Sequence, residues 1–293
     1  MGVGLGGRAA LAVVFFVVCA AGVKGCQTYR HVRGTYHPPR GPVAKPPELA
    51  AQIEDVTLRL ADGTPVAAWL LAARNGATVV YVHGASGDRR DLVADAAALR
   101  GAGYGAVLLD LLGHGASGGT ATWGRSDEAA VEAAVDLAVS RGARVALLGF
   151  ASGASIAARV AARDARVRAV VLTGAFTDAR AQLRVEYARW GPVTEWPAVK
   201  AAEHEGIDLD ELDSRDVVAR IAPRPVRFVG GSVDRVVPPA MVCELFADAR
   251  EPKELEIVPG ADHGQYGAVG GDAYYERTRG FLDRALDVAP APP

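Results

Sequence analysis

The chain has 293 residues, half of them hydrophobic, and a formal net charge of −2. This length suits one large domain with a sizeable buried core, and the near-neutral charge without a basic stripe argues against a nucleic-acid partner. The three cysteines, Cys19, Cys26 and Cys243, have no paired spacing, so neither a disulfide framework nor a C-x-x-C metal site is predicted.

An apolar run stands near the start of the chain, at residues 9–23, between Arg8 and Lys24. Its length of about 15 residues is short for a spanning helix and fits the core of a signal peptide, but the glycines before it can lengthen it. We therefore expect residues 1–24 to be a signal peptide or a retained membrane anchor. The side of the membrane stays open, because basic residues after the run favour a cytoplasmic domain whereas a signal peptide exports it.

Five prolines between Tyr36 and Pro47 predict an extended linker, which we place at residues 25–52. After the linker, strands and helices alternate. The predicted strands are Ile53–Leu60, Val66–Ala72, Ala77–Val82, Gly105–Asp110, Arg144–Gly149, Val167–Leu172, Pro225–Gly230 and Leu255–Val258. The predicted helices are Asp91–Arg100, Asp127–Ser140, Ser155–Arg163, Pro239–Ala249 and Tyr274–Asp287. This pattern predicts an α/β domain over residues 53–290, with a mostly parallel sheet and helices on both faces.

The segment 178–215 breaks the alternation and predicts a small cap inserted over the carboxyl edge of the sheet. It contains Tyr187, Trp190 and Trp196. These aromatic residues favour an apolar cap and an acyl or aromatic ligand group, although aromatic residues in a cap serve packing as often. The natural ligand cannot be read from the sequence.

The loop after the strand Arg144–Gly149 carries the most informative motif. A sharp strand-to-helix turn of form G-x-S-x-G presents a nucleophilic serine, and its two glycines relieve crowding. Gly149 and Gly153 occupy the glycine positions, and the residue midway between them is Ala151. The nucleophile position is therefore predicted to hold a methyl group.

Ser152 is the alternative nucleophile. A motif centred on it puts Phe150 and Ala154 in the glycine positions, where the phenylalanine ring crowds the turn. In the preferred register the backbone N–H of Ser152 is one donor of an oxyanion hole. The second donor is the N–H of Ala85, which follows His83-Gly84 at the end of an earlier strand.

Two later loops supply an acid and then a base. Asp234 follows the strand Pro225–Gly230, and His263 follows the next strand. The chain order of nucleophile, acid and histidine is that of a catalytic triad on this kind of sheet. Asp234 is predicted to orient His263, which takes the nucleophile's proton.

Together these motifs resemble bacterial α/β-hydrolases of the serine aminopeptidase and dienelactone-hydrolase-like kind, many of which have an N-terminal membrane segment. The resemblance covers residues 53–286. It rests on Asp62-Gly63 before Trp69, His83-Gly84, Asp110, Gly113-His114-Gly115, Ser117, the turn at Gly149–Gly153, Asp234–Pro238 and Pro259–His263. The resemblance implies an α/β-hydrolase fold with Asp234 as acid and His263 as base. The chain departs from the family at Ala151 and at Leu112, where an arginine is common.

Three hypotheses for function follow. The first is a non-catalytic or weakly active relative that binds a small acyl-type molecule or a partner. The second is an active ester or amide hydrolase that uses Ser152 or a water activated by His263. The third is an ordinary esterase or peptidase into which alanine was introduced. No metal or organic cofactor is predicted, because the histidines lack ligand spacing; the oligomeric state stays open.

Overall fold

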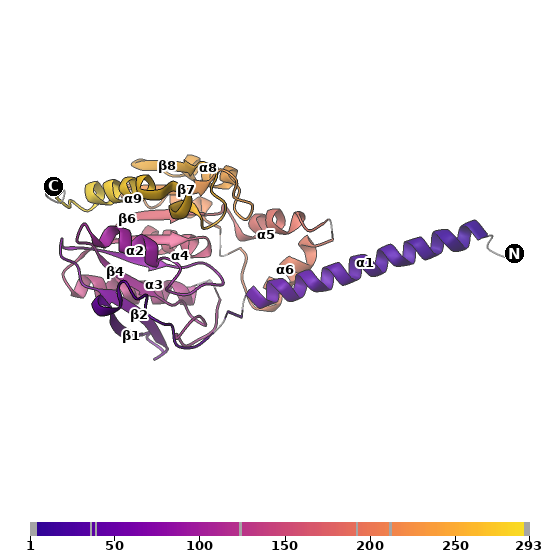
Figure 1. The fold of residues 1–293 in the computed structure, drawn as a ribbon, viewed down its shortest axis with the longest axis horizontal. Helices are drawn as coiled ribbons and strands as arrows, with labels where there is room; N and C mark the ends of the chain where they lie inside the picture. The colour runs from indigo at the N-terminus through magenta and orange to yellow at the C-terminus, as the bar shows by residue number, and fades with distance from the viewer. Residues whose placement is uncertain are drawn as a thin grey trace.

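The structure is a computed structural model, and it describes residues 5–35, 37–38, 40–122, 125–191, 193–210 and 213–289. An eight-stranded sheet lies at its centre, in the order β1-β2-β4-β3-β5-β6-β7-β8 (Figure 1). The strands are β1 (Glu54–Arg59), β2 (Pro65–Leu71), β3 (Ala77–Val82), β4 (Gly105–Leu109), β5 (Arg144–Phe150), β6 (Val167–Thr173), β7 (Val226–Gly231) and β8 (Lys253–Val258). Each of the eight corresponds to a strand predicted from the sequence.

Strand direction brings the predicted loops to one edge of the sheet. β2 pairs antiparallel with both β1 and β4. The remaining pairs, from β4 through β3, β5, β6 and β7 to β8, are parallel. Because parallel strands end at the same edge, the loops after β3, β5, β7 and β8 meet there. The predicted fold class, a mostly parallel sheet covered by helices, is confirmed.

Helices cover both faces of this sheet (Figure 1). The helices are α1 (Leu5–Thr35), the 3₁₀ turn η1 (Ala50–Gln52), α2 (Val93–Arg100), α3 (Arg125–Ser140), α4 (Ser152–Arg163), α5 (Ala179–Ala188), α6 (Glu195–His204), α7 (Arg215–Val218), α8 (Pro239–Asp248) and α9 (Tyr266–Ala285). α2 and α9 contact each other, and α3, α4, α7 and α8 form a chain of neighbours. α9 begins earlier than the sequence predicted and is kinked at Gly271.

Alternating side chains of β3 pack into two separate hydrophobic cores, one on each face of the sheet. Every residue of β3 is buried. Val80 and Val82 belong to the core shared with α3, α4 and the cap, whereas Val79 and Tyr81 belong to the core shared with α2 and α9. Successive side chains of a strand point to opposite faces, so a strand that is apolar throughout requires helices on both sides.

The cap segment 178–215 contains α5 and α6, and α1 packs along α6. Contacts of α1 with the cap include aromatic and ionic ones. The ring of His31 lies 4.8 Å from that of Trp190, and Nζ of Lys24 lies 5.5 Å from the centre of the same indole. Arg33 pairs with Glu205 of the cap. Residues 25–35 of the predicted linker are therefore helical and docked.

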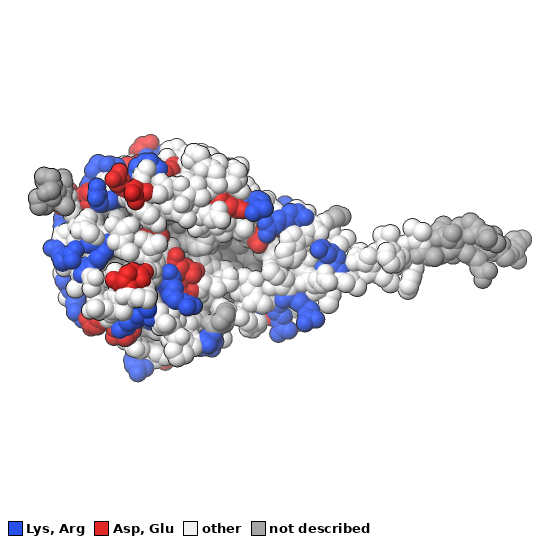
Figure 2. All heavy atoms as spheres, in the orientation of Figure 1, with Lys and Arg blue, Asp and Glu red and all other residues white. Residues whose placement is uncertain are grey.

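The amino-terminal half of α1 extends away from the cap (Figure 1). Its described surface is uncharged there, and lysine and arginine side chains gather where α1 meets the cap (Figure 2). Within the described ranges, no helix combines the length and the apolar character that crossing a bilayer requires, so the predicted transmembrane helix is not found there. Residues 1–4 of the predicted segment 1–24 lie outside the described residues.

Candidate active site

A single residue, Ala151, joins β5 to α4, and it forms the apex of the turn. Its backbone angles are φ 51° and ψ −117°, a conformation that is strained for a residue with a side chain. Gly149 and Gly153 lie on either side of it, and the backbone is packed too closely at both for a side chain. A Cβ atom at Gly153 would lie 2.3 Å from the carbonyl oxygens of Val82 and His83. The apex of this strained turn, which is the predicted nucleophile position, thus carries no side-chain oxygen.

Ser152 is the first residue of α4 and not the apex. It is 3% exposed, and it lines the central cavity. Its Oγ atom is buried and has no hydrogen-bond partner among the described residues. Ser152 therefore makes no hydrogen bond to His263 that could activate it as a nucleophile.

His263 and Asp234 come together from the loops after β8 and β7. Nδ1 of His263 donates to Oδ2 of Asp234 at 2.9 Å. Oδ1 of Asp234 accepts the N–H groups of Val236 at 2.9 Å and Val237 at 2.8 Å. Burial alone raises the pKa of Asp234, but the hydrogen bond and the charge of His263, with the other donors, lower it overall. Asp234 is thus held as a carboxylate that orients the imidazole.

Sequence reasoning missed two neighbours of this pair. The hydroxyl of Tyr266 donates to Oδ2 of Asp234 at 2.7 Å, and burial raises the pKa of Tyr266. The ring of Phe150 lies 4.8 Å from that of His263. Tyr266 opens a helix that was predicted to begin at Tyr274, so no pattern in the sequence marked it.

The loop after β3 is fixed by two buried histidines. The N–H of Leu111 donates to Nε2 of His83 at 3.0 Å, so the proton of His83 is on Nδ1, 2.7 Å from the carbonyl of Gly84. Burial, with the nearby His114, lowers the pKa of His83 to about 3, which keeps it neutral. Nε2 of His114 lies 2.7 Å from the carbonyl oxygen of Ala85.

These contacts leave the two predicted oxyanion donors free. The N–H groups of Ala85 and Ser152 form no hydrogen bond with another described residue. Both residues line the central cavity together with Ala151 and His263. Unpaired N–H groups from a loop and from a helix N-terminus are the elements of an oxyanion hole.

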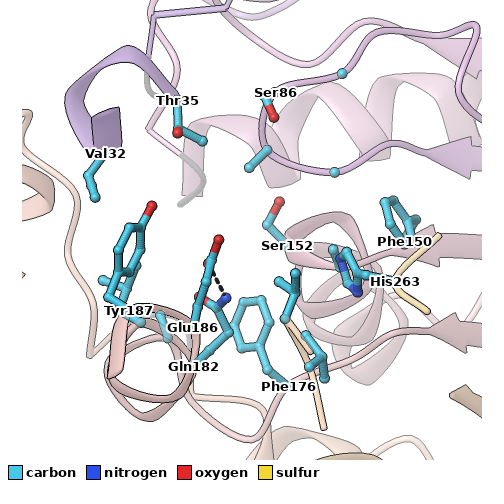
Figure 3. Close-up of a pocket in the computed structure, with 18 of the residues that line it drawn as sticks. Val32, Thr35, Ser86, Phe150, Ser152, Phe176, Gln182, Glu186, Tyr187 and His263 are labelled. Carbon is cyan, nitrogen blue, oxygen red and sulfur yellow. Dashed lines mark hydrogen bonds between the residues drawn. The ribbon is translucent and has the colours of Figure 1, made fainter. Parts of the chain in front are cut away.

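The cavity has a volume of about 250 Å³ and lies between the sheet edge and the cap (Figure 3). Cap residues line it, including Leu183, Glu186 and Tyr187. Val32 and Thr35 of α1 also line it, although no pattern in the sequence places α1 at the cavity. Of the three aromatic residues noted in the predicted cap, Tyr187 lines the cavity and Trp196 is 70% exposed. No group of three or more histidine, cysteine or acidic side chains suited to a metal ion is found within the described residues.

Comparison with known proteins agrees with this architecture. Residues 73–222 match the family described as serine aminopeptidase, S33. The chain belongs to this family. Among solved structures, an esterase of Pyrococcus furiosus superposes with a TM-score of 0.71 at 21% identity, over 86% of this chain and 98% of that one. An α/β-hydrolase from Penicillium sp. sh18 superposes with a TM-score of 0.65 at 22% identity, over 80% of this chain and 99% of that one. The fold is thus the α/β-hydrolase fold.

Two bacterial proteins are similar over most of their length. An uncharacterized protein of Mycobacterium tuberculosis is 27% identical over 281 residues, which cover 94% of this chain and 95% of that protein. The uncharacterized protein YfhR of Escherichia coli is 26% identical over 249 residues, which cover 80% of this chain and 82% of that protein. The similarity to the mycobacterial protein covers 94% of this chain, so it extends beyond residues 73–222, the part that matches the family.

Proposed function

We propose that this protein binds a small acyl-type ligand in its central cavity and has lost serine-hydrolase turnover. The observation that carries this proposal is the placement of Ala151 at the apex of the strained turn, with φ 51°. An alanine cannot form an acyl-enzyme intermediate. Loss of a triad nucleophile lowers turnover by a factor on the order of 10⁶.

The surroundings of Ala151 support retention of the cavity for binding. Asp234 keeps its four hydrogen bonds to His263, Tyr266, Val236 and Val237. The oxyanion donors Ala85 and Ser152 line the same cavity. A pocket with apolar walls and a few convergent polar groups is the usual form of a small-molecule site.

A second candidate is hydrolysis by water, which the bond between His263 and Asp234 favours. In this reaction Nε2 of His263 takes a proton from water as the water oxygen bonds to the ester carbonyl carbon. The N–H groups of Ala85 and Ser152 hold the oxyanion. The carbon–oxygen bond to the alcohol then breaks, and the proton of His263 passes to the leaving alkoxide.

The test assays the full chain with short-acyl p-nitrophenyl esters and with a fluorophosphonate probe. We expect no labelling by the probe. We also expect no ester turnover that depends on His263, so His263→Ala should leave the rate unchanged. Labelling that disappears in Ser152→Ala would instead identify Ser152 as a working nucleophile. Unlabelled turnover that depends on His263 would establish the water mechanism.

We also propose that the N-terminal segment attaches the protein to a lipid surface. Valine and phenylalanine side chains at positions 13–18 of α1 are 59–74% exposed, which is costly in water for so many adjacent apolar groups. The measurement is flotation of the full chain with phospholipid vesicles. A full chain that stays with the unbound fraction would contradict this proposal.

A further inference from the structure

One buried hydroxyl in the cavity has no partner. Ser152 is 3% exposed, and its Oγ atom makes no hydrogen bond with any described residue. The hydroxyl is directed into the cavity (Figure 3). A buried polar group left unpaired is unfavourable, so its surroundings call for a ligand atom that accepts a hydrogen bond.

The same position is the N-terminus of α4, which has 12 residues. The first N–H groups of a helix lack partners within it and carry partial positive charge, which favours a bound anion. The N–H of Ala85 adds a donor from the opposite loop, and it forms no hydrogen bond with another described residue. Three donors from Ala85 and Ser152 therefore serve one cavity.

A fourth donor is available on His263. Its Nδ1 is bonded to Asp234, and its Nε2 has no hydrogen bond among the described residues. An imidazolium at this position would pair with an anionic ligand through Nε2–H. In an active serine hydrolase the serine hydroxyl is the partner of this atom. Ala151 supplies no such oxygen.

We propose that the cavity binds a monocarboxylate, with one carboxylate oxygen on the N–H groups of Ala85 and Ser152 and on the Ser152 hydroxyl, and the other on Nε2 of His263. This proposal rests on the proposed function, because it uses the space that Ala151 leaves. A carboxylate is the acyl-type group that offers two acceptor oxygens on one carbon, and an ionised acceptor strengthens both sets of hydrogen bonds.

The remainder of the cavity selects the tail of the ligand. Phe176, Leu183 and Val236 provide apolar walls. Glu186, which accepts a hydrogen bond from Gln182 at 2.7 Å, is a lining carboxylate of the cap. A second carboxylate on the ligand would meet this negative charge, so we expect a monocarboxylate to bind more tightly than a dicarboxylate.

The experiment measures binding to the full chain by titration calorimetry. The probes are acetate, butyrate, hexanoate and octanoate, their primary amides, and adipate. We expect at least one straight-chain carboxylate to bind roughly tenfold or more tightly than its amide, since hydrogen bonds to an ionised group are stronger than hydrogen bonds to a neutral one. Adipate should bind more weakly than hexanoate.

Variants locate the bound group. Ala151→Ser should weaken carboxylate binding by about tenfold, because its hydroxyl takes the place of one ligand oxygen beside His263. Ser152→Ala should weaken it less. Ser140→Ala, at an exposed position at the end of α3, is the matched control and should bind like the original chain.

The outcomes separate the two proposals. Equal affinity for acid and amide, no binding of any carboxylate in the series, or an affinity unchanged by Ala151→Ser overturns the carboxylate site and leaves the loss of turnover standing. Ester turnover that depends on His263 in the original chain overturns the proposed function, whatever the calorimetry shows.

Discussion

Nδ1 of His263 lies 2.9 Å from Oδ2 of Asp234, and His263 lines the same cavity as Ala151, whose side chain has no hydroxyl. Asp234 and His263, the predicted acid and base, are thus held together. Their geometry does not depend on the side chain of Ala151, because the contacts of Asp234 come from its own loop, from His263 and from Tyr266. The arrangement of Asp234 and His263 is therefore independent of the side chain at position 151.

Restoring the hydroxyl at the apex should restore hydrolysis. Ala151→Ser adds one oxygen at a backbone conformation that is already that of the strained turn, so no rearrangement is required. We expect ester turnover to rise by a factor on the order of 10³ or more, together with covalent labelling by a fluorophosphonate. Initial rates with p-nitrophenyl butyrate provide the measurement.

The double variant Ala151→Ser/His263→Ala is the control for this experiment. It should lose both the gained turnover and the labelling. An Ala151→Ser protein that is folded by circular dichroism but takes up no probe would show that residue 151 is not directed at His263.

The turn at Gly149–Gly153 packs closely against the end of β3, so Gly153 should not tolerate any side chain. In Gly153→Ala the new Cβ would lie 2.3 Å from two backbone carbonyl oxygens. We expect the free energy of unfolding to fall by about 3 kcal/mol or more, measured by urea denaturation. Gly101→Ala is the matched control, because nothing lies within 4 Å of its Cβ position. Equal stability of the two variants would refute this account of the turn.

Stability should depend on pH through Asp95 of α2. Burial raises the pKa of Asp95 to about 6, although a hydrogen bond from the hydroxyl of Tyr274 opposes the shift. The native state then binds more protons than the unfolded state between about pH 4 and pH 6. The stability contributed by protonated Asp95 is present below that window and is lost as the pH rises through it.

Asp95→Asn removes this titration. The variant should be more stable than the original chain near neutral pH, by an amount on the order of 2 kcal/mol, and the difference should shrink below about pH 4. Chemical denaturation of both proteins across this range is the measurement. A stability difference that stays constant with pH would rule out the buried, uncharged state of Asp95.

Docking of α1 on the cap should depend on Val32, which is 1% exposed and lines the cavity. Val32→Asp places an unpaired charge in the core, so we expect the carboxyl end of α1 to detach. Limited proteolysis should then cut between α1 and β1, and ligand affinity should fall. Val23→Asp on the exposed surface of the same helix is the control, and it should leave cleavage unchanged.

The strands could be predicted because local pattern determines them. Runs such as Ala77–Val82 are apolar without alternation, which is typical of a parallel strand buried on both faces of a sheet. The strand-to-helix turn was equally visible, since the crowding at Gly153 allows only a residue without a side chain. Where helix ends depend on packing, as at Tyr266, the sequence placed the boundary several residues away.

The sequence by itself determined that residue 151 carries no hydroxyl, because chemical identity needs no coordinates. Only the tertiary structure decided what surrounds it. His263 contacts Asp234 at 2.9 Å, and Val32 of α1 lines the same cavity as His263, although these residues are far apart in the chain. The burial of the unpaired Ser152 hydroxyl likewise depends on the elements packed around it. Such contacts arise from the packing of whole elements against one another, and no local pattern of residues encodes them.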